Sequence, residues 1–138
     1  MRLFLIGLGG ALGSIARYLF SSFVLRVSGT LFPVGTFAVN LVGCMLFGAI
    51  IGAAQQRFVL TPEKNAFLLV GVLGGFTTFS SFAYESFALA QDGQFLAVAV
   101  NIFGQVITAG LVGLWAGYVI TQLITLERAE VLLYRPGR

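Results

Sequence analysis

Residues 74–86, with the sequence GGFTTFSSFAYES, place hydroxyl groups, phenylalanines and a carboxylate inside a hydrophobic stretch. The edge of an aromatic ring carries partial positive charge, so a row of ring edges can face an anion. Hydroxyl groups can donate hydrogen bonds to the same anion as it loses its water. If a helix resumes near Phe79, then Phe76, Phe79 and Phe82 share one stripe. The alternative for each residue is that the rings only pack and the hydroxyls bond back to helix carbonyls.

Polar side chains flank this stripe on both sides. They are Thr77, Ser80 and Tyr84 on one side, and Thr78, Ser81 and Glu85 on the other. The adjacent Gly74 and Gly75, followed by Thr77 and Thr78, predict a break in the helix within residues 74–78. A break frees backbone carbonyls, which are tolerated at membrane depth only where something satisfies them. Unwound carbonyls in transporters commonly hold a cation such as Na⁺. Together, the broken helix and the polar flanks predict an ion pathway.

Three further polar positions lie inside hydrophobic blocks, where such groups are costly unless they pair or line water. Thr36 and Asn40 are four residues apart and share one helix face. Asn40 is equally consistent with an interhelical hydrogen-bond clamp and with a donor to a permeating ion. Arg17 either extends its side chain to the nearer membrane interface or forms an electropositive vestibule that attracts anions.

A second polar stripe is predicted in the last of the hydrophobic blocks. Asn101, Gln105 and Thr108 follow one another at i, i+4 and i+7, which places them on one face of an α-helix. A stripe of this kind either joins helices by hydrogen bonds or lines a path. Three polar residues in register favour a path.

The elements that carry these residues are predicted to be four transmembrane helices. The chain has 138 residues, of which 58% are hydrophobic and 9% are charged, whereas soluble domains average about 25% charged residues. The hydrophobic blocks are too long and too continuous for barrel strands. We expect one all-α membrane domain over residues 1–126, with helices at about 3–27, 33–54, 66–90 and 95–126, followed by a polar tail at 127–138.

Charge and composition narrow the possible partners. The chain has no histidine and one cysteine, Cys44, which excludes a disulfide within the chain and a metal site of the Cys/His type. No basic, aromatic-interleaved patch indicates a nucleic-acid partner. The N-terminal block is expected to be a retained membrane helix rather than a signal peptide. Most of the Lys and Arg residues outside the hydrophobic blocks fall on one side of the membrane, which predicts that both termini lie in the cytoplasm. Half of the residues on that side belong to the tail.

Three segments resemble the Fluc (CrcB) family of bacterial fluoride channels. They are GGALGSIARY at 9–18, GTFAVNLVG at 35–43 and GGFTTFSSF at 74–82. The resemblance covers nearly the whole chain, up to about Thr125. It implies an antiparallel, dual-topology homodimer in the bacterial inner membrane, with four helices per subunit, a broken third helix and two fluoride pores. It also implies that the Gly74 and Thr77 carbonyls of both subunits enclose a structural Na⁺.

The same resemblance assigns further roles residue by residue. Asn40 lies on the ion path, and Phe79 and Phe82 turn their ring edges toward fluoride. Arg17 lies near a pore mouth and Glu85 close to the pathway. The hydroxyl positions of the motif are matched by Thr78, Ser80 and Ser81. This chain carries Gln105 where many members of the family have serine. The difference puts in question whether the second polar stripe lines the ion path.

Two other functions are consistent with a chain of this composition. A proton-coupled small-multidrug exporter needs a carboxylate buried in the membrane, and Glu85 is the one candidate. A structural membrane subunit that acts only with a partner is the other alternative. The channel reading predicts passive fluoride export and no catalysed reaction, so the chain is not expected to be an enzyme.

Overall fold

The computed structural model describes residues 1–56 and 59–133, with the side chains of 127–133 excepted. Every regular element in this part of the chain is helical. The elements are α1 (Arg2–Ser28), α2 (Val34–Gln56), α3 (Pro62–Lys64), η1 (Asn65–Leu73), α4 (Gly74–Phe76), α5 (Phe79–Gln91), α6 (Phe95–Phe103), η2 (Gly104–Val112) and α7 (Gly113–Leu133). The segments named η1 and η2 are π-helices.

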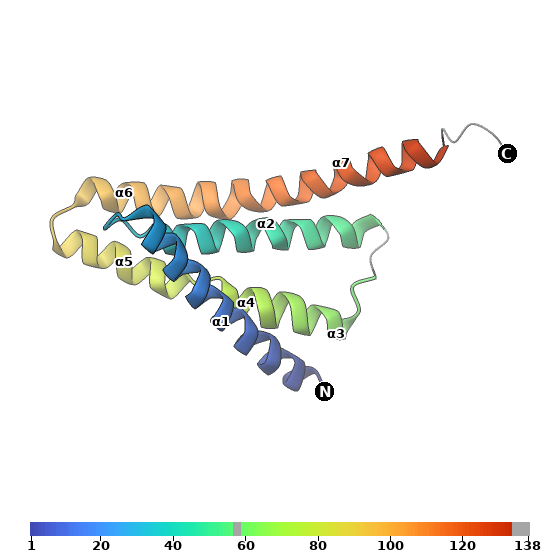
Figure 1. Cartoon of the computed structure of the whole chain (residues 1–138), viewed down its shortest axis with the longest axis horizontal. Coiled ribbons are helices and arrows are strands. Elements are labelled where there is room, and N and C mark those ends of the chain that lie inside the picture. The colour runs from blue at the N-terminus through green and yellow to red at the C-terminus, as the bar shows by residue number, and fades with distance from the viewer. Residues whose placement is uncertain (57–58, 134–138) are drawn as a thin grey trace.

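These elements form four spans that are long and apolar enough to cross a membrane. The spans are Arg2–Ser28, Val34–Gln56, Pro62–Gln91 and Phe95–Leu126. The prediction of an all-helical protein with four membrane-spanning segments is therefore confirmed. The start of α1 and the last described turn of α7 lie toward the same side of the bundle in Figure 1, as an even number of spans requires.

The start of the third span and the end of the last helix differ from the predicted limits. The third span begins at Pro62 rather than at residue 66, because Pro62 occupies the first helical turn and the Thr61 hydroxyl accepts a hydrogen bond from the Lys64 backbone N–H. The fourth span ends at Leu126 as predicted, but its last helix, α7, continues beyond it to Leu133, since residues 127–133 include several good helix formers. Among the charges that predicted the orientation, Arg57, Arg135 and Arg138 lie outside the described residues.

Glycines allow α2 and α7 to pack at unusually short range. A Cβ atom at Gly48 would lie 2.0 Å from the Leu114 carbonyl oxygen, and one at Gly117 would lie 1.9 Å from that of Met45. Small residues let membrane helices approach one another closely, and Gly48 and Gly117 do so between α2 and α7.

Glycines on α1 make a second close contact, with the first half of the third span. A Cβ atom at Gly13 would lie 2.1 Å from the Val72 carbonyl oxygen. One at Gly75 would lie 2.6 Å from the carbonyl oxygen of Gly10. Gly75 therefore serves helix packing here, and both Gly74 and Gly75 are helical.

The irregular backbone in the third span lies just after these glycines. Thr77 has φ −76° and ψ 157°, and Thr78 has φ −150° and ψ 120°, so both are extended. Helix α4 ends at Phe76 and α5 begins at Phe79. The irregular residues thus lie within the predicted segment 74–78, but they are Thr77 and Thr78 rather than the glycines, which belong to a helix that packs against α1.

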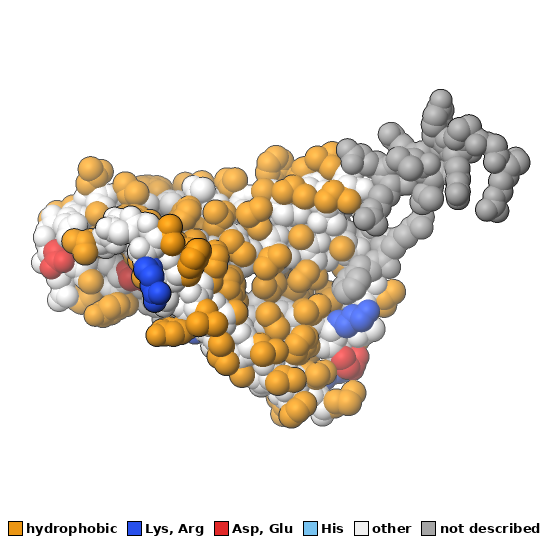
Figure 2. All heavy atoms as spheres, viewed as in Figure 1, with side chains coloured by type: hydrophobic (Ala, Val, Ile, Leu, Met, Phe, Trp, Pro, Cys, Tyr) orange, Lys and Arg blue, Asp and Glu red, His pale blue; other side chains and the backbone are white. Residues whose placement is uncertain are grey.

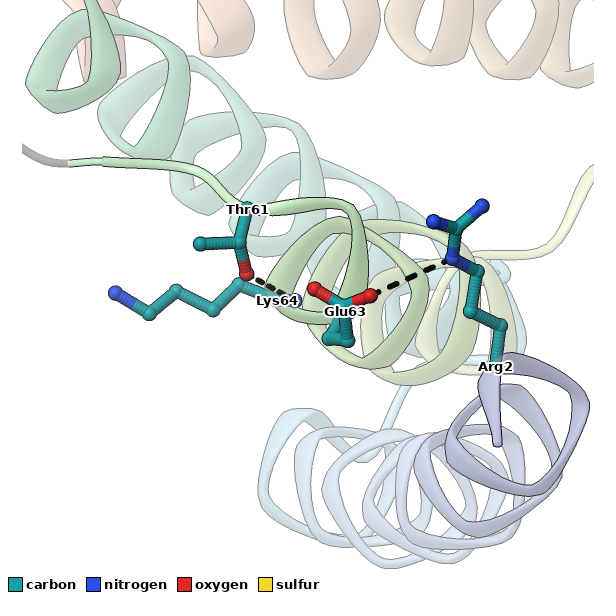
Figure 3. A network of polar contacts seen from close by, with 4 residues as sticks. All are labelled: Arg2, Thr61, Glu63 and Lys64. Carbon is teal, nitrogen blue, oxygen red and sulfur yellow. Dashed lines mark hydrogen bonds and ion pairs between the residues drawn. The ribbon is translucent and has the colours of Figure 1, made fainter.

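The outer surface of the described chain is largely hydrophobic, as Figure 2 shows for one face. An exposed ion pair ties the first and third spans together at the end where both begin: Arg2 Nε lies 3.5 Å from Glu63 Oε1 (Figure 3). The third span begins beside this pair, where Thr61 caps its first turn. Exposed pairs of this kind contribute little to stability, about 0–1 kcal/mol. The hydrophobic surface is what identifies the lipid environment.

Candidate ion-pathway site

The extended residue Thr78 is held by the amide of Asn40 on α2. Asn40 Oδ1 accepts a hydrogen bond from the Thr78 backbone N–H at 2.8 Å, and Asn40 Nδ2 donates to the Thr78 carbonyl at 3.0 Å. The second Nδ2 hydrogen is directed to Gln105 Oε1 at 2.9 Å. Asn40 thus replaces the helical partners that Thr78 lacks, which is the clamp that the sequence left open as one of two roles.

The side chain of Thr78 starts helix α5. Its Oγ1 accepts a hydrogen bond from the Ser81 backbone N–H at 3.2 Å, which is the standard N-cap contact. The same oxygen donates to Ser81 Oγ at 3.1 Å and lies 3.3 Å from Ser80 Oγ. The structure therefore brings the three predicted hydroxyl residues together around the start of α5.

A pocket of about 300 Å³ lies on one side of Thr78. Its walls include Arg17 and the hydroxyl residues Ser14, Ser21 and Ser81. Arg17 Nη1 donates a hydrogen bond to the Thr77 carbonyl at 3.3 Å. The guanidinium thus points inward to the irregular backbone, and its charge stands beside a wall of hydroxyl groups.

A second pocket, of about 260 Å³, also includes Thr78 in its wall. It is lined by the amides of Asn40 and Gln105 and by the rings of Phe79 and Phe82. Thr78 is thus the residue that the two pockets share. Neither pocket has a carboxylate among its lining residues. We refer to them below as the hydroxyl pocket and the aromatic pocket.

The phenylalanines do not form the single stripe that an unbroken helix predicts. Phe76 is buried and packs on Phe20 of α1, with ring centroids 6.1 Å apart. Phe79 and Phe82 instead meet edge to face, with centroids 5.3 Å apart and planes at 69°. Phe82 is 7% exposed and Phe79 is 76% exposed. The extended residues before α5 separate Phe76 from the other two rings.

Only two of the three residues of the predicted second polar stripe share a buried face. Asn101 and Gln105 are buried, at 1% and 6% exposed, whereas Thr108 is exposed. The π-helix η2 has a longer repeat than an α-helix, so the next buried residue is Ala109, four positions after Gln105. Placing Thr108 in this stripe was wrong for that reason.

Glu85 lies next to the hydroxyl pocket rather than in its wall. Its Oε1 accepts a hydrogen bond from Thr36 Oγ1 at 2.5 Å, and Thr36 lines the pocket. Its Oε2 is buried and has no hydrogen-bond partner among the residues that the structure describes. The carboxylate also lines a separate pocket that includes Asp92.

Some residues of the site were missed in the sequence. Ser14 and Ser21 were missed: they lie three residues before and four residues after the predicted Arg17 on α1, and this spacing could have predicted a polar face. Ser86 was also missed: it donates to the Phe82 carbonyl at 2.9 Å and accepts from Asn101 Nδ2 at 3.0 Å. No spacing within α5 indicates that Asn101 is its partner.

The chain matches the sequence model of a known protein family over most of its length. The model of the family described as CrcB-like protein, Camphor Resistance (CrcB), matches residues 4–118. The chain belongs to the CrcB-like family. The family match includes both pockets and the irregular backbone between them.

Individual relatives agree with this assignment. A protein of Nitratidesulfovibrio vulgaris, named fluoride-specific ion channel FluC, is 46% identical over 116 residues, which are 84% of this chain and 93% of the relative. A protein of Geobacter sulfurreducens with the same name is 45% identical over 112 residues, 81% of this chain and 90% of the relative. The CrcB-like family and the four spans together identify a multi-pass membrane protein.

Proposed function

We propose that this protein is a fluoride-selective channel that lets the ion leave the cytoplasm passively. The observation that carries the proposal is the pair of pockets that share Thr78 in their walls, which combine hydrogen-bond donors, ring edges and Arg17 without a carboxylate. The names of the CrcB-like relatives support fluoride as the ion. The test is fluoride efflux from liposomes that contain the purified protein, followed with a fluoride electrode. Absence of efflux would reject the proposal.

The chemistry of the pockets fits a small and strongly hydrated anion. Fluoride can be dehydrated only if many close donors replace its water. Arg17 and the serines of the hydroxyl pocket attract the ion and begin this exchange. The aromatic pocket offers ring edges and amide hydrogens, which are weak individual sites from which the ion can also leave. No bond is made or broken, so the activity is transport and not catalysis.

The proposed assembly is an antiparallel homodimer with two pores. Phe79, although it lines the aromatic pocket, is 76% exposed in a single chain. A second copy would cover this ring and complete the wall of the pocket. When the tail and the undescribed residues are left out, one end of the bundle carries the positive charges of Arg2 and Lys64, and the other end carries that of Arg26. This small difference is compatible with insertion in both orientations.

The carbonyls of Gly74 and Thr77 are proposed to hold a structural Na⁺. In an unbroken helix they would accept from Thr78 and Ser81, but those N–H groups bond to Asn40 Oδ1 and Thr78 Oγ1 instead. Oxygens released in this way suit a hard cation. The Thr77 oxygen also accepts from Arg17 at 3.3 Å. The two carbonyl oxygens of one chain are too few to coordinate Na⁺, so the proposed site also needs the same two oxygens of the second copy.

Removing sodium provides a test of this site. We expect that replacing Na⁺ by N-methylglucamine on both sides of the membrane lowers fluoride efflux, and that returning Na⁺ restores it, because the cation orders the backbone beside both pockets. Efflux is measured with the electrode at constant ionic strength, with K⁺ and valinomycin kept present to balance charge. Equal efflux with and without Na⁺, in protein dialysed against a sodium-free buffer, would contradict the sodium site but not the channel.

Passive export suits a protein of the bacterial inner membrane. Hydrogen fluoride crosses lipid as a neutral molecule and dissociates in a less acidic cytoplasm, where the anion becomes trapped. A channel selective for fluoride returns the anion down its gradient without an energy source. This role needs only the lipid bilayer, the fluoride ion and a second copy of the chain as partners.

A further inference from the structure

The amide of Gln105 has hydrogen-bonding capacity that no residue in the described chain uses. Gln105 is 6% exposed and lines the aromatic pocket together with Phe79 and Phe82. Its Oε1 accepts from Asn40, but its Nε2 is buried without a hydrogen-bond partner. A buried donor without a partner is rare in folded proteins and calls for an explanation. An acceptor inside the aromatic pocket would supply one.

Asn40 cannot serve as that donor without giving up a contact that it already makes. Its two Nδ2 hydrogens are directed to the Thr78 carbonyl and to Gln105 Oε1. Its Oδ1 accepts from the Thr78 N–H. Of the two amides in the wall of the aromatic pocket, Gln105 is therefore the one with N–H groups to spare.

The orientation of the Gln105 amide follows from the backbone of Thr78. Because the Thr78 N–H needs an acceptor and its carbonyl needs a donor, Asn40 must place Oδ1 and Nδ2 in one fixed order. Asn40 Nδ2 then faces Gln105 Oε1, which turns the Gln105 oxygen toward Asn40 and leaves Nε2 for the pocket. The opposite orientation would present an oxygen to the pocket and repel an anion.

We infer that Gln105 Nε2 is a direct fluoride donor in the aromatic pocket, and that Asn40 is the positioning residue that keeps this amide in its donor orientation. This inference rests on the proposed channel function. It assigns Asn40 a role behind the ion path and gives the donor role to a residue in which this chain departs from the serine of many family members.

Gln105→Met and Gln105→Glu test the donor role by efflux of fluoride from liposomes. Methionine has a similar length but no N–H, and we expect efflux at least about tenfold slower, equivalent to about 1.4 kcal/mol in the barrier. Gln105→Glu replaces the donor by an acceptor of the same shape, so efflux should be slower still. Thr108→Val is the matched control, because Thr108 is exposed on the same π-helix. It should transport as the unchanged protein does.

Side-chain amide resonances of the unchanged protein provide a test that does not depend on how a variant folds. With ¹⁵N-labelled glutamine and asparagine, sodium fluoride should shift the Gln105 amide pair strongly and the Asn40 pair weakly. Sodium chloride should shift neither. Fluoride shifts confined to Asn40, or a folded Gln105→Met that transports at the unchanged rate, would overturn the inference. If the unchanged protein transports no fluoride, the proposed function fails instead.

Discussion

Phe82→Ile is expected to slow fluoride efflux by at least about tenfold while leaving the protein folded. The Phe82 ring lies in the wall of the aromatic pocket and is only 7% exposed. Isoleucine is also hydrophobic but has no ring edge with partial positive charge to face an anion. Losing about 1.4 kcal/mol of stabilisation of the ion at its highest energy barrier corresponds to a tenfold slower rate. The rate is measured as initial fluoride efflux per reconstituted protein.

Phe87→Ile is the matched control for this variant. Phe87 lies on the same helix α5 and is exposed, and it is not in the wall of either pocket. Its replacement should leave efflux unchanged, whereas Phe79→Ile should resemble Phe82→Ile because both rings line the aromatic pocket. If Phe82→Ile is well folded by gel filtration and transports at the unchanged rate, the ring-edge role is wrong.

Gly117→Ala is expected to destabilise the protein by roughly 3 kcal/mol or more, at the upper end of the cost of overpacking. The added methyl group would lie 1.9 Å from the Met45 carbonyl oxygen of α2. The obstacle is backbone, so relief requires the two helices to separate. Since α2 also carries Asn40, the separation should disturb the aromatic pocket. The free energy of unfolding is measured by titrating detergent-solubilised protein with SDS.

Gly7→Ala separates crowding from the general effect of replacing a helical glycine. A Cβ atom at Gly7 has no neighbouring heavy atom within 4 Å. Alanine is also the better helix former, by about 1 kcal/mol. Gly7→Ala should therefore be as stable as the unchanged protein or slightly more stable. Similar unfolding curves for Gly7→Ala and Gly117→Ala would contradict the close packing of α2 on α7.

The spans and their close contacts could be predicted from the sequence because both depend on local composition. Long hydrophobic blocks define the spans, and small residues such as Gly48 and Gly117 indicate where helices approach one another. The sequence did not indicate that Gly48 would face Leu114. Spacing along one helix defines a face but does not identify the neighbouring helix.

Details of the site depended on backbone irregularities that residue spacing does not reveal. The π-helix η2 moves Thr108 out of the buried stripe, and the extended residues after α4 separate Phe76 from Phe79. Asn40 could be singled out in the sequence because it is a polar residue inside a hydrophobic block, but both of its candidate roles remained open. Only the contact with Thr78, 38 residues away in the chain, shows what it bonds.

The central claim is selectivity for fluoride, and the most direct measurement compares fluoride and chloride efflux from the same preparation. Liposomes containing the purified protein are loaded with potassium fluoride or potassium chloride, and efflux is started with valinomycin and followed with ion-selective electrodes. Protein-free liposomes give the background at the same pH. We predict rapid fluoride efflux and chloride efflux no faster than background. Equal chloride efflux, or substrate-dependent proton flux that Glu85→Gln abolishes, would contradict a fluoride channel.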